Sequence, residues 1–261
     1  MKAICDDLKA EYEELDAIVS ELSDSGWDKV TPFYNWTIRD EISHIAWADS
    51  ISLLAATDER KFKEHAKDAM KDIDEFFDIA KRIGQGKKPS QILEWWRSER
   101  NGLISTLKQS HPKTKLPWYG PSMNAMSFAT ARIMETWAHG QDIVDTLGIN
   151  RQNTGRLRHI AHLGYRTMSF AYLIRGREAP EVPIRVELES PQAEIWSWGP
   201  EDAKDIVRGT AEDFCLAVTR RRHINDVSLE INGSTANEWM TICQVFAGPP
   251  DDGAKAGRFK K

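Results

Sequence analysis

The sequence predicts an α+β protein made of an all-α domain over residues 1–177 and a small α+β domain over residues 178–261. Two observations lead to this prediction. Up to about residue 175, apolar residues recur at the three- and four-residue spacing of amphipathic helices. From residue 183 onward, several segments alternate apolar and polar residues with the period of two that is typical of strands. The length of 261 residues also suits two small domains.

Six helical segments are expected in the first domain, because each carries its apolar residues on one face. They cover residues 3–23, 37–57, 58–84, 91–109, 122–147 and 156–175. Thr37 and Asp40 form a variant of the capping box at the start of the second segment. Ser122 is the expected start of the fifth. The charged segment 58–84 is expected to hold one or two helices inserted into a bundle.

The second domain is expected to begin with a β-hairpin. Alternation over residues 183–190 and 193–198 predicts its two strands, and Pro191-Gln192 lies between them as the turn. The remaining elements are a third strand over 205–210, a fourth strand or extended segment over 227–233, and two helices over 211–222 and 236–246. The tail 248–261 is rich in glycine and proline and is expected to be mobile.

Composition argues against several classes of protein. A net charge of −5 argues against nucleic acid, since a polyanion favours a basic surface. No apolar run approaches the roughly 20 residues that span a bilayer, so no membrane segment is expected. The acidic N-terminus lacks the apolar core of a signal peptide, which favours a cytoplasmic protein. Three widely spaced cysteines without a CxxC pattern disfavour both disulfides and a thiolate zinc site.

The most informative residues are Glu135 and His139, which are four residues apart on a predicted helix and therefore share one face. A carboxylate and an imidazole both bind divalent metals of the zinc, nickel or iron type. His44, on another helix, is the best candidate for a third ligand. Asp142 follows His139 by three residues and could orient it or act as a further ligand. Arg132 precedes Glu135 by three residues and could be its salt-bridge partner.

Spacing alone also allows an ordinary explanation. A Glu/His pair at i and i+4 occurs in many solvated helices, and a single histidine such as His44 is more often part of a core than a ligand. The longer motifs around these residues decide in favour of a site, because of the family that they resemble.

The segment Trp36-Thr-Ile-Arg-Asp-Glu-Ile-Ser-His44 and the later Glu135-Thr-Trp-Ala-His139 resemble the DinB-like metal-binding four-helix bundles. More narrowly, they resemble the mycothiol-dependent maleylpyruvate isomerase group. In that group the metal is held by one histidine of the second bundle helix and a Glu-x3-His of the last. The resemblance therefore implies the metal ligands His44, Glu135 and His139. The motif Trp196-Ser-Trp-Gly-Pro-Glu-Asp resembles a subfamily with a small sterol-carrier-like C-terminal domain.

The resemblance implies a divalent-metal-dependent enzyme that uses a low-molecular-weight, mycothiol-like thiol for addition, isomerisation or transfer on a small electrophilic substrate. Zinc is the expected metal, with nickel or iron as alternatives. Arg132 or an arginine of the second domain could hold a carboxylate of such a substrate. The alternative functions are a metal-containing small-molecule binding protein without turnover, and a bundle whose site is a remnant. A homodimer is common among such bundles, and the sequence leaves it open.

Overall fold

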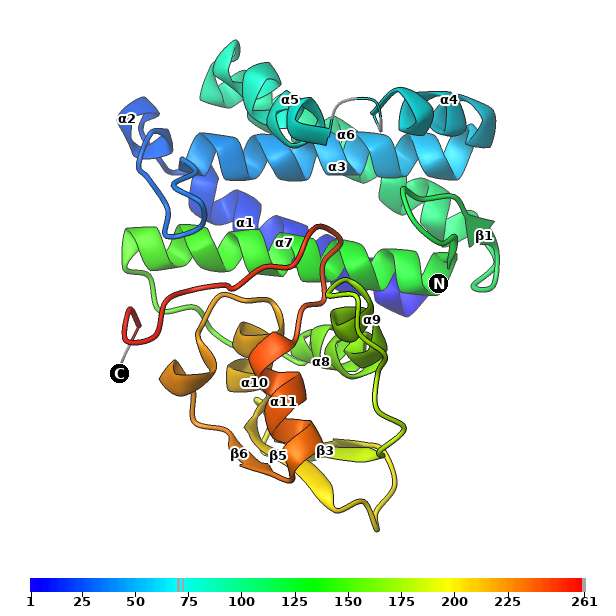
Figure 1. The fold of residues 1–261 in the computed structure, drawn as a ribbon. Helices are drawn as coiled ribbons and strands as arrows, with labels where there is room; N and C mark the ends of the chain where they lie inside the picture. Colours follow the sequence, from blue (N-terminus) through cyan, green and yellow to red (C-terminus); the bar gives the residue numbers. More distant parts are fainter. Residues whose placement is uncertain (70, 72, 260–261) are drawn as a thin grey trace. The chain divides into compact units, whose positions relative to one another are not determined.

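The computed structural model describes residues 1–69, 71 and 73–259 of the chain. The chain divides into two compact units, Met1–Ile149 and Asn150–Lys261 (Figure 1). The first unit is helical apart from two very short strands, and the second combines a small sheet with helices. The predicted α+β class is therefore confirmed.

Four long helices form the body of the first unit (Figure 1). They are α1 (Lys2–Ser20), α3 (Ile38–Thr57), α6 (Pro89–Gln109) and α7 (Ala125–Leu147). Helix α1 contacts α6 and α7, and α3 contacts the same two helices, so the four close into a bundle. Its interior is apolar: Leu8, Ile45, Trp96 and Ile133 are all buried. Each such side chain contributes about 1.5–3 kcal/mol to folding.

The start of α3 matters most for the site, because this helix carries His44. The amide of Asp40 donates to Thr37 Oγ1 at 3.2 Å, and the amide of Thr37 donates to Asp40 Oδ2 at 2.9 Å. This is the predicted capping box. It satisfies two backbone donors at the helix end and fixes where the first turn begins.

The start of α7 differs from the prediction. The helix begins at Ala125, and Asn124 caps it by accepting a hydrogen bond from the amide of Ser127 at 2.8 Å. The residues before it pair as a short antiparallel ribbon of β1 (Lys115–Leu116) and β2 (Met123–Asn124). The predicted helix start at Ser122 is therefore wrong, since β2 lies between Ser122 and the helix.

The charged segment 58–84 forms two helices, α4 (Glu59–Ala69) and α5 (Ile73–Gln85), which pack against α3. Its residues 70 and 72 lie outside the described residues. Helix α5 comes close to α3 at Gly84, where an added Cβ would lie 2.0 Å from Ser43 Oγ. A further single-turn helix, α2 (Asp24–Trp27), precedes the loop that leads into α3.

The second unit is built around a four-stranded sheet in the order β4-β3-β5-β6. Its strands are β3 (Ile184–Glu189), β4 (Ile195–Trp198), β5 (Asp205–Thr210) and β6 (Glu230–Asn232). Strands β3 and β4 form the predicted antiparallel hairpin, and β5 runs parallel to β3 with Val186 beside Val207. Alternate residues of β3 are buried, which explains the period of two in the sequence.

The single helix predicted over 156–175 is wrong, because the chain forms α8 (Leu157–Arg166) and α9 (Met168–Leu173). The break falls at Thr167, whose hydroxyl donates to the carbonyl of Leu163 at 2.9 Å. Helix α8 packs on α10 (Ala211–Val218) so closely that a Cβ on Gly164 would lie 2.9 Å from the Phe214 ring. The division between units therefore falls earlier than the boundary expected near residue 178. It follows the left-handed C-cap of α7 at Gly148.

The remaining helices of this unit are α11 (Ser234–Ile242) and the short 3-10 helix η1 (Ile224–Asp226). The tail that was expected to be mobile makes hydrogen bonds within this unit. The amide of Ala254 donates to the carbonyl of Arg220 at 3.3 Å, and that of Gly257 to Asp226 at 2.8 Å. Across the described residues, no helix is both long enough and apolar enough to cross a membrane.

Candidate metal centre

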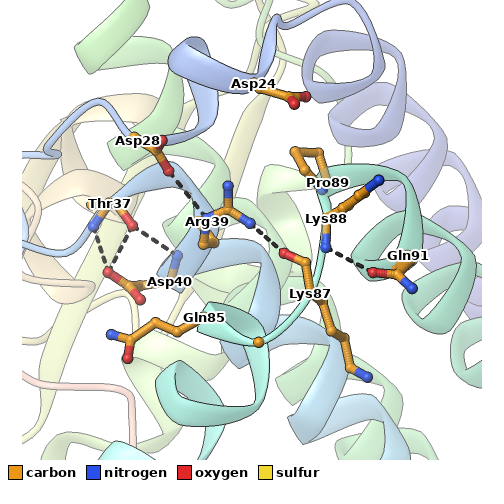
Figure 2. A pocket seen from close by; sticks show the side chains of 11 residues that line it. Asp24, Asp28, Thr37, Arg39, Asp40, Gln85, Lys87, Lys88, Pro89 and Gln91 are labelled. Atoms are coloured by element: carbon orange, nitrogen blue, oxygen red, sulfur yellow. Dashed lines mark hydrogen bonds and ion pairs between the residues drawn. The ribbon is translucent and has the colours of Figure 1, made fainter.

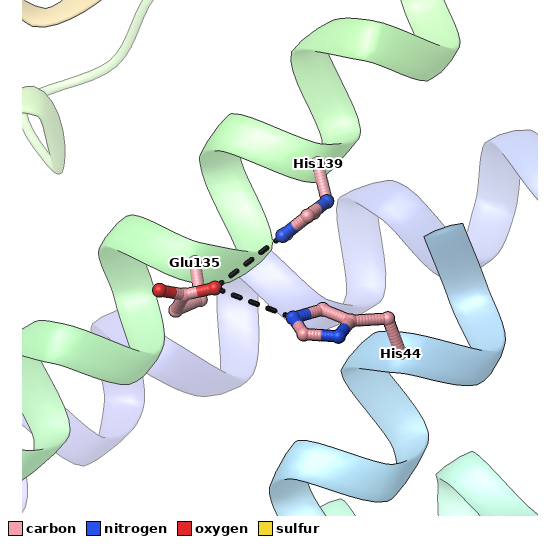
Figure 3. A group of neighbouring side chains, drawn as sticks. All are labelled: His44, Glu135 and His139. Carbon is pink, nitrogen blue, oxygen red and sulfur yellow. Dashed lines mark ion pairs between the residues drawn. The ribbon is translucent and has the colours of Figure 1, made fainter. Parts of the chain in front are cut away.

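His44 of α3 and the pair Glu135 and His139 of α7 converge inside the bundle (Figure 3). Glu135 Oε2 lies 3.7 Å from His44 Nε2 and 3.4 Å from His139 Nε2. The three potential ligand atoms all lie within 4.8 Å of one another. The structure thus brings together the three residues that were predicted as ligands, although about ninety residues separate His44 from Glu135 in the chain.

The three residues fit a divalent ion in both chemistry and spacing. Two imidazoles and one carboxylate are the donors of open zinc sites and of non-haem iron sites. Ligand atoms about 2.0–2.1 Å from one tetrahedral ion lie roughly 3.3 Å from each other. The separations of 3.4 and 3.7 Å are close to this value. Small side-chain shifts would therefore be enough to accommodate an ion.

The electrostatics also suit ligation. Burial lowers the pKa of His44, so the ring is neutral and keeps a lone pair. Burial alone would raise the pKa of Glu135, but its polar contacts with His139 and His44 outweigh it and bring that pKa well below its usual range. Neutral imidazole and ionised carboxylate are the forms that bind metal. The side chains of His44 and Glu135 are 22% and 21% exposed, so the centre is not sealed.

Aromatic rings from α3 and from the loop before it wall this centre. The Trp36 ring stacks on His139 at 5.9 Å between ring centroids and lies 5.2 Å from His44. Phe33 meets the His139 ring edge-on at 5.6 Å, and Trp47 lies 6.4 Å from His44. Apolar rings keep water away from part of the centre, which strengthens electrostatic interactions there.

Arg132 is directed at another carboxylate. Its Nε donates to Asp49 Oδ1 at 2.9 Å, and the two side chains are 4% and 0% exposed. Asp49 also accepts hydrogen bonds from the Tyr12 hydroxyl at 2.7 Å and the Trp96 indole at 3.1 Å. Asp49 is thus the salt-bridge partner of Arg132, whose charge still helps to lower the pKa of Glu135. A role for Arg132 in holding a substrate carboxylate stays a prediction.

One residue of the centre was not anticipated from the sequence. His139 Nδ1 donates to Glu41 Oε2 at 2.6 Å, and Glu41 is fully buried. Glu41, His139 and Asp142 form a second group whose potential ligand atoms lie within 4.8 Å of one another. Asp142 is therefore close to His139, and Glu41 is hydrogen-bonded to the His139 ring. A role for Asp142 in orienting His139 or as a further ligand stays a prediction. The sequence feature that could have pointed to Glu41 is its position three residues before His44, on the same face of the helix.

The structure also contains an open cavity of about 690 Å³ away from this centre, between the start of α3 and the turn that joins α5 to α6 (Figure 2). Arg39 lies in its wall. Its guanidinium donates to Asp28 at 3.1 Å and to the carbonyl of Lys87 at 2.7 Å. The cavity thus lies where the α5–α6 turn is joined to α3. It is not lined by His44, Glu135 or His139.

Comparison with known proteins bears on both units. Residues 8–144 match the family model described as the mycothiol maleylpyruvate isomerase N-terminal domain. Two uncharacterized proteins of Mycobacterium tuberculosis, one from strain H37Rv and one from strain CDC 1551, are each 44% identical over 247 residues, which is 95% of this chain and 96% of theirs. The crystal structure of the mycothiol-dependent maleylpyruvate isomerase is similar, with a TM-score of 0.57 and 14% identity over 96% of this chain and 95% of that one. A mutant of the same enzyme gives the same TM-score at 13% identity. At such low identity, the two crystal structures establish a shared fold.

Proposed function

Because this chain belongs to the family of the mycothiol maleylpyruvate isomerase N-terminal domain, we propose that it is a divalent-metal-dependent enzyme that uses a low-molecular-weight thiol on a small electrophilic substrate. The family name points to isomerase chemistry with mycothiol. The observation that carries the metal part of the proposal is the convergence of His44, Glu135 and His139, at separations of 3.4 and 3.7 Å. Zinc suits these donors best, and nickel or iron are the alternatives.

A divalent ion at these residues would lower the pKa of a thiol that binds at its open position. The residues around the ion would favour the thiolate form. Glu135 supplies one negative charge, and the two imidazoles supply neutral donors, so part of the positive charge is left to stabilise a thiolate. Trp36 and Phe33 cover the His139 side and limit access of water there.

The proposed reaction is addition of the thiolate to an activated carbon–carbon double bond. A carbon–sulfur bond forms, and the π electrons move onto the conjugated carbonyl as an enolate. The former double bond is now single and can rotate. When the enolate electrons return, the carbon–sulfur bond breaks and the thiolate leaves, so isomerisation consumes no proton or electron. If the enolate carbon takes a proton from solvent instead, the result is addition. If a leaving group departs, the result is transfer.

Metal binding tests the first part of this proposal. We expect the wild-type protein to bind one divalent ion per chain, and His44→Ala to bind it at least about 100-fold more weakly because a ligand is lost. The matched control is His111→Ala, since His111 is an exposed histidine of the same unit. Equal metal content in wild type and His44→Ala would exclude the site.

Turnover tests the second part. Mycothiol and glutathione would each be incubated with maleylpyruvate-like cis-enone acids and with other electrophiles, and both isomerisation and thiol consumption would be followed. The proposal predicts activity that depends on the metal and is lost in His44→Ala. Metal binding without turnover with any thiol would favour the alternative, a metal-containing binding protein.

A further inference from the structure

We propose that Glu41 is a positioning residue that holds His139 by its Nδ1 and so presents Nε2 to the metal centre. The inference rests on the proposed function, because it concerns the same centre. It goes beyond the three ligands in assigning a role to a buried carboxylate and to the loop that supports it.

The two ring nitrogens of His139 have different partners. Nδ1 lies 2.6 Å from Glu41 Oε2, which is hydrogen-bond distance. A carboxylate oxygen accepts this hydrogen bond and Nδ1–H donates it. Nε2 is then the nitrogen left to bind a metal, and it lies 3.4 Å from Glu135 Oε2. The ring is thereby fixed in the tautomer that a metal ligand requires.

Glu41 is itself held in place. The Thr31 hydroxyl donates to Glu41 Oε1 at 2.7 Å, and Thr31 is 2% exposed. The Thr31 amide donates to the carbonyl of Trp36 at 2.6 Å, and its hydroxyl also lies 3.3 Å from the carbonyl of Phe33. The loop 31–36 therefore anchors the carboxylate and at the same time carries two of the rings that wall the centre.

Glu41 could instead be a metal ligand, in the group that it forms with His139 and Asp142. The distances argue against this. Two atoms that bind the same tetrahedral ion lie roughly 3.3 Å apart. Glu41 Oε2 and His139 Nδ1 are only 2.6 Å apart, too close to share an ion without moving but right for a hydrogen bond. The group with Glu135 has the wider spacing that ligation needs.

The test is Glu41→Gln, measured in two ways. Competition against a chromophoric chelator should show zinc affinity lower by about 10–100-fold, the usual cost of losing a hydrogen-bond partner of a ligand histidine. Nitrogen-15 NMR of the metal-free protein should show that His139 no longer has its proton only on Nδ1. Glu13→Gln, an exposed glutamate of α1, controls for the loss of one negative charge and should change neither result.

Thr31 gives a second, milder pair of variants in case Glu41→Gln does not fold. Thr31→Val removes the hydroxyl that holds Glu41, and we expect zinc affinity to fall by several-fold, within about 10-fold. Thr31→Ser keeps the hydroxyl and should restore wild-type affinity. If Thr31 served only to fill space, Thr31→Val, which keeps the volume, would be the milder variant. If its hydroxyl matters, Thr31→Ser is the milder variant.

Three outcomes would overturn the inference. The first is unchanged zinc affinity in Glu41→Gln, together with an unchanged His139 tautomer. The second is a cobalt(II) spectrum that shows one ligand fewer in Glu41→Gln, since Glu41 would then be a ligand. The third is a metal-free wild type in which the His139 proton is on Nε2. A wild type that binds no metal would contradict the proposed function instead, and the NMR result would still decide the role of Glu41.

Discussion

At the scale of single residues, the register of α7 against the rest of the bundle depends on Asp49. This carboxylate accepts hydrogen bonds from Tyr12, Trp96 and Arg132, which come from three different helices. Arg132 lies on the same helix as Glu135 and His139 and is almost fully buried. The ion pair of Asp49 with Arg132 therefore fixes the position of α7, the helix that supplies two of the three candidate ligands.

Asp49→Asn tests this role. The substitution leaves the Arg132 charge buried without its counter-charge, and we expect the free energy of unfolding to fall by about 3–5 kcal/mol. Chemical denaturation with urea measures it. Asp28→Asn is the matched control, since it removes a carboxylate that pairs with Arg39 but is exposed, and it should cost less than about 1 kcal/mol. Equal losses in the two variants would contradict the role of Asp49.

Asp16 predicts how stability depends on pH. Burial would raise the pKa of Asp16, but hydrogen bonds from Arg97 and Ser20 and the nearby charge of Arg100 lower it to about 2. A carboxyl with a lowered pKa in the folded state stabilises the fold above its unfolded pKa of about 4, and this stabilisation is lost as pH falls towards about 2. Unfolding should therefore become easier over that window in wild type, and less so in Asp16→Asn. Identical pH profiles would refute the prediction.

At the scale of elements, α5 can lie against α3 only because residue 84 is glycine. An added Cβ would lie 2.0 Å from Ser43 Oγ and 2.6 Å from Ser43 Cβ. Ser43 is the residue before His44, so the contact involves the turn of α3 that carries a candidate ligand. The two helices that were predicted as an insertion thus pack on the helix that supplies His44.

Gly84→Ala should therefore move α5 away from α3 and destabilise the protein by about 1–3 kcal/mol, as overpacking does. Thermal and urea unfolding measure this cost. Gly86→Ala is the matched control, because its Cβ would meet only the carbonyl oxygen of Ile83, at 3.9 Å. If the two alanine variants were equally stable, the close packing of α5 on α3 would be contradicted.

The ends of the helices show which structural features could be predicted from the sequence and which could not. The capping box of Thr37 and Asp40 was predictable because both partners lie within one turn. The break at Thr167 was not, since a threonine is tolerated within helices and only the packing of α8 on α10 shows where that helix belongs. The start of α7 was missed for a similar reason. Strand β2 occupies the two residues before the helix, where it pairs with β1, and two-residue strands leave almost no sequence pattern.

At the scale of the whole molecule, the centre lies within the first unit. The ligands and Glu41 all lie in Met1–Ile149, as do the residues that support them. The sequence pointed to these candidate ligands through the spacing of Glu135 and His139 and through the family resemblance. It did not identify Glu41, because an acidic residue in the first turn of a helix already has a local explanation in the helix dipole. Its partner His139 is also 98 residues away in the chain.

A fragment of residues 1–149 tests this organisation. We expect it to fold cooperatively as a helical protein and to bind a divalent ion with the affinity of the full chain, within about 10-fold, because every donor is present. Circular dichroism and chelator competition measure the two properties. A fragment that folds but binds no metal, while the full chain does, would mean that residues beyond 149 complete the centre.

The central claim is that His44, Glu135 and His139 together hold a divalent ion. Crystals of the zinc-loaded protein, measured at energies just above and below the zinc absorption edge, test it most directly. The account predicts one strong anomalous peak per chain, about 2.0–2.2 Å from His44 Nε2, His139 Nε2 and a carboxylate oxygen of Glu135. A peak bound by Glu41 and Asp142 instead, or no peak at these residues, would contradict it.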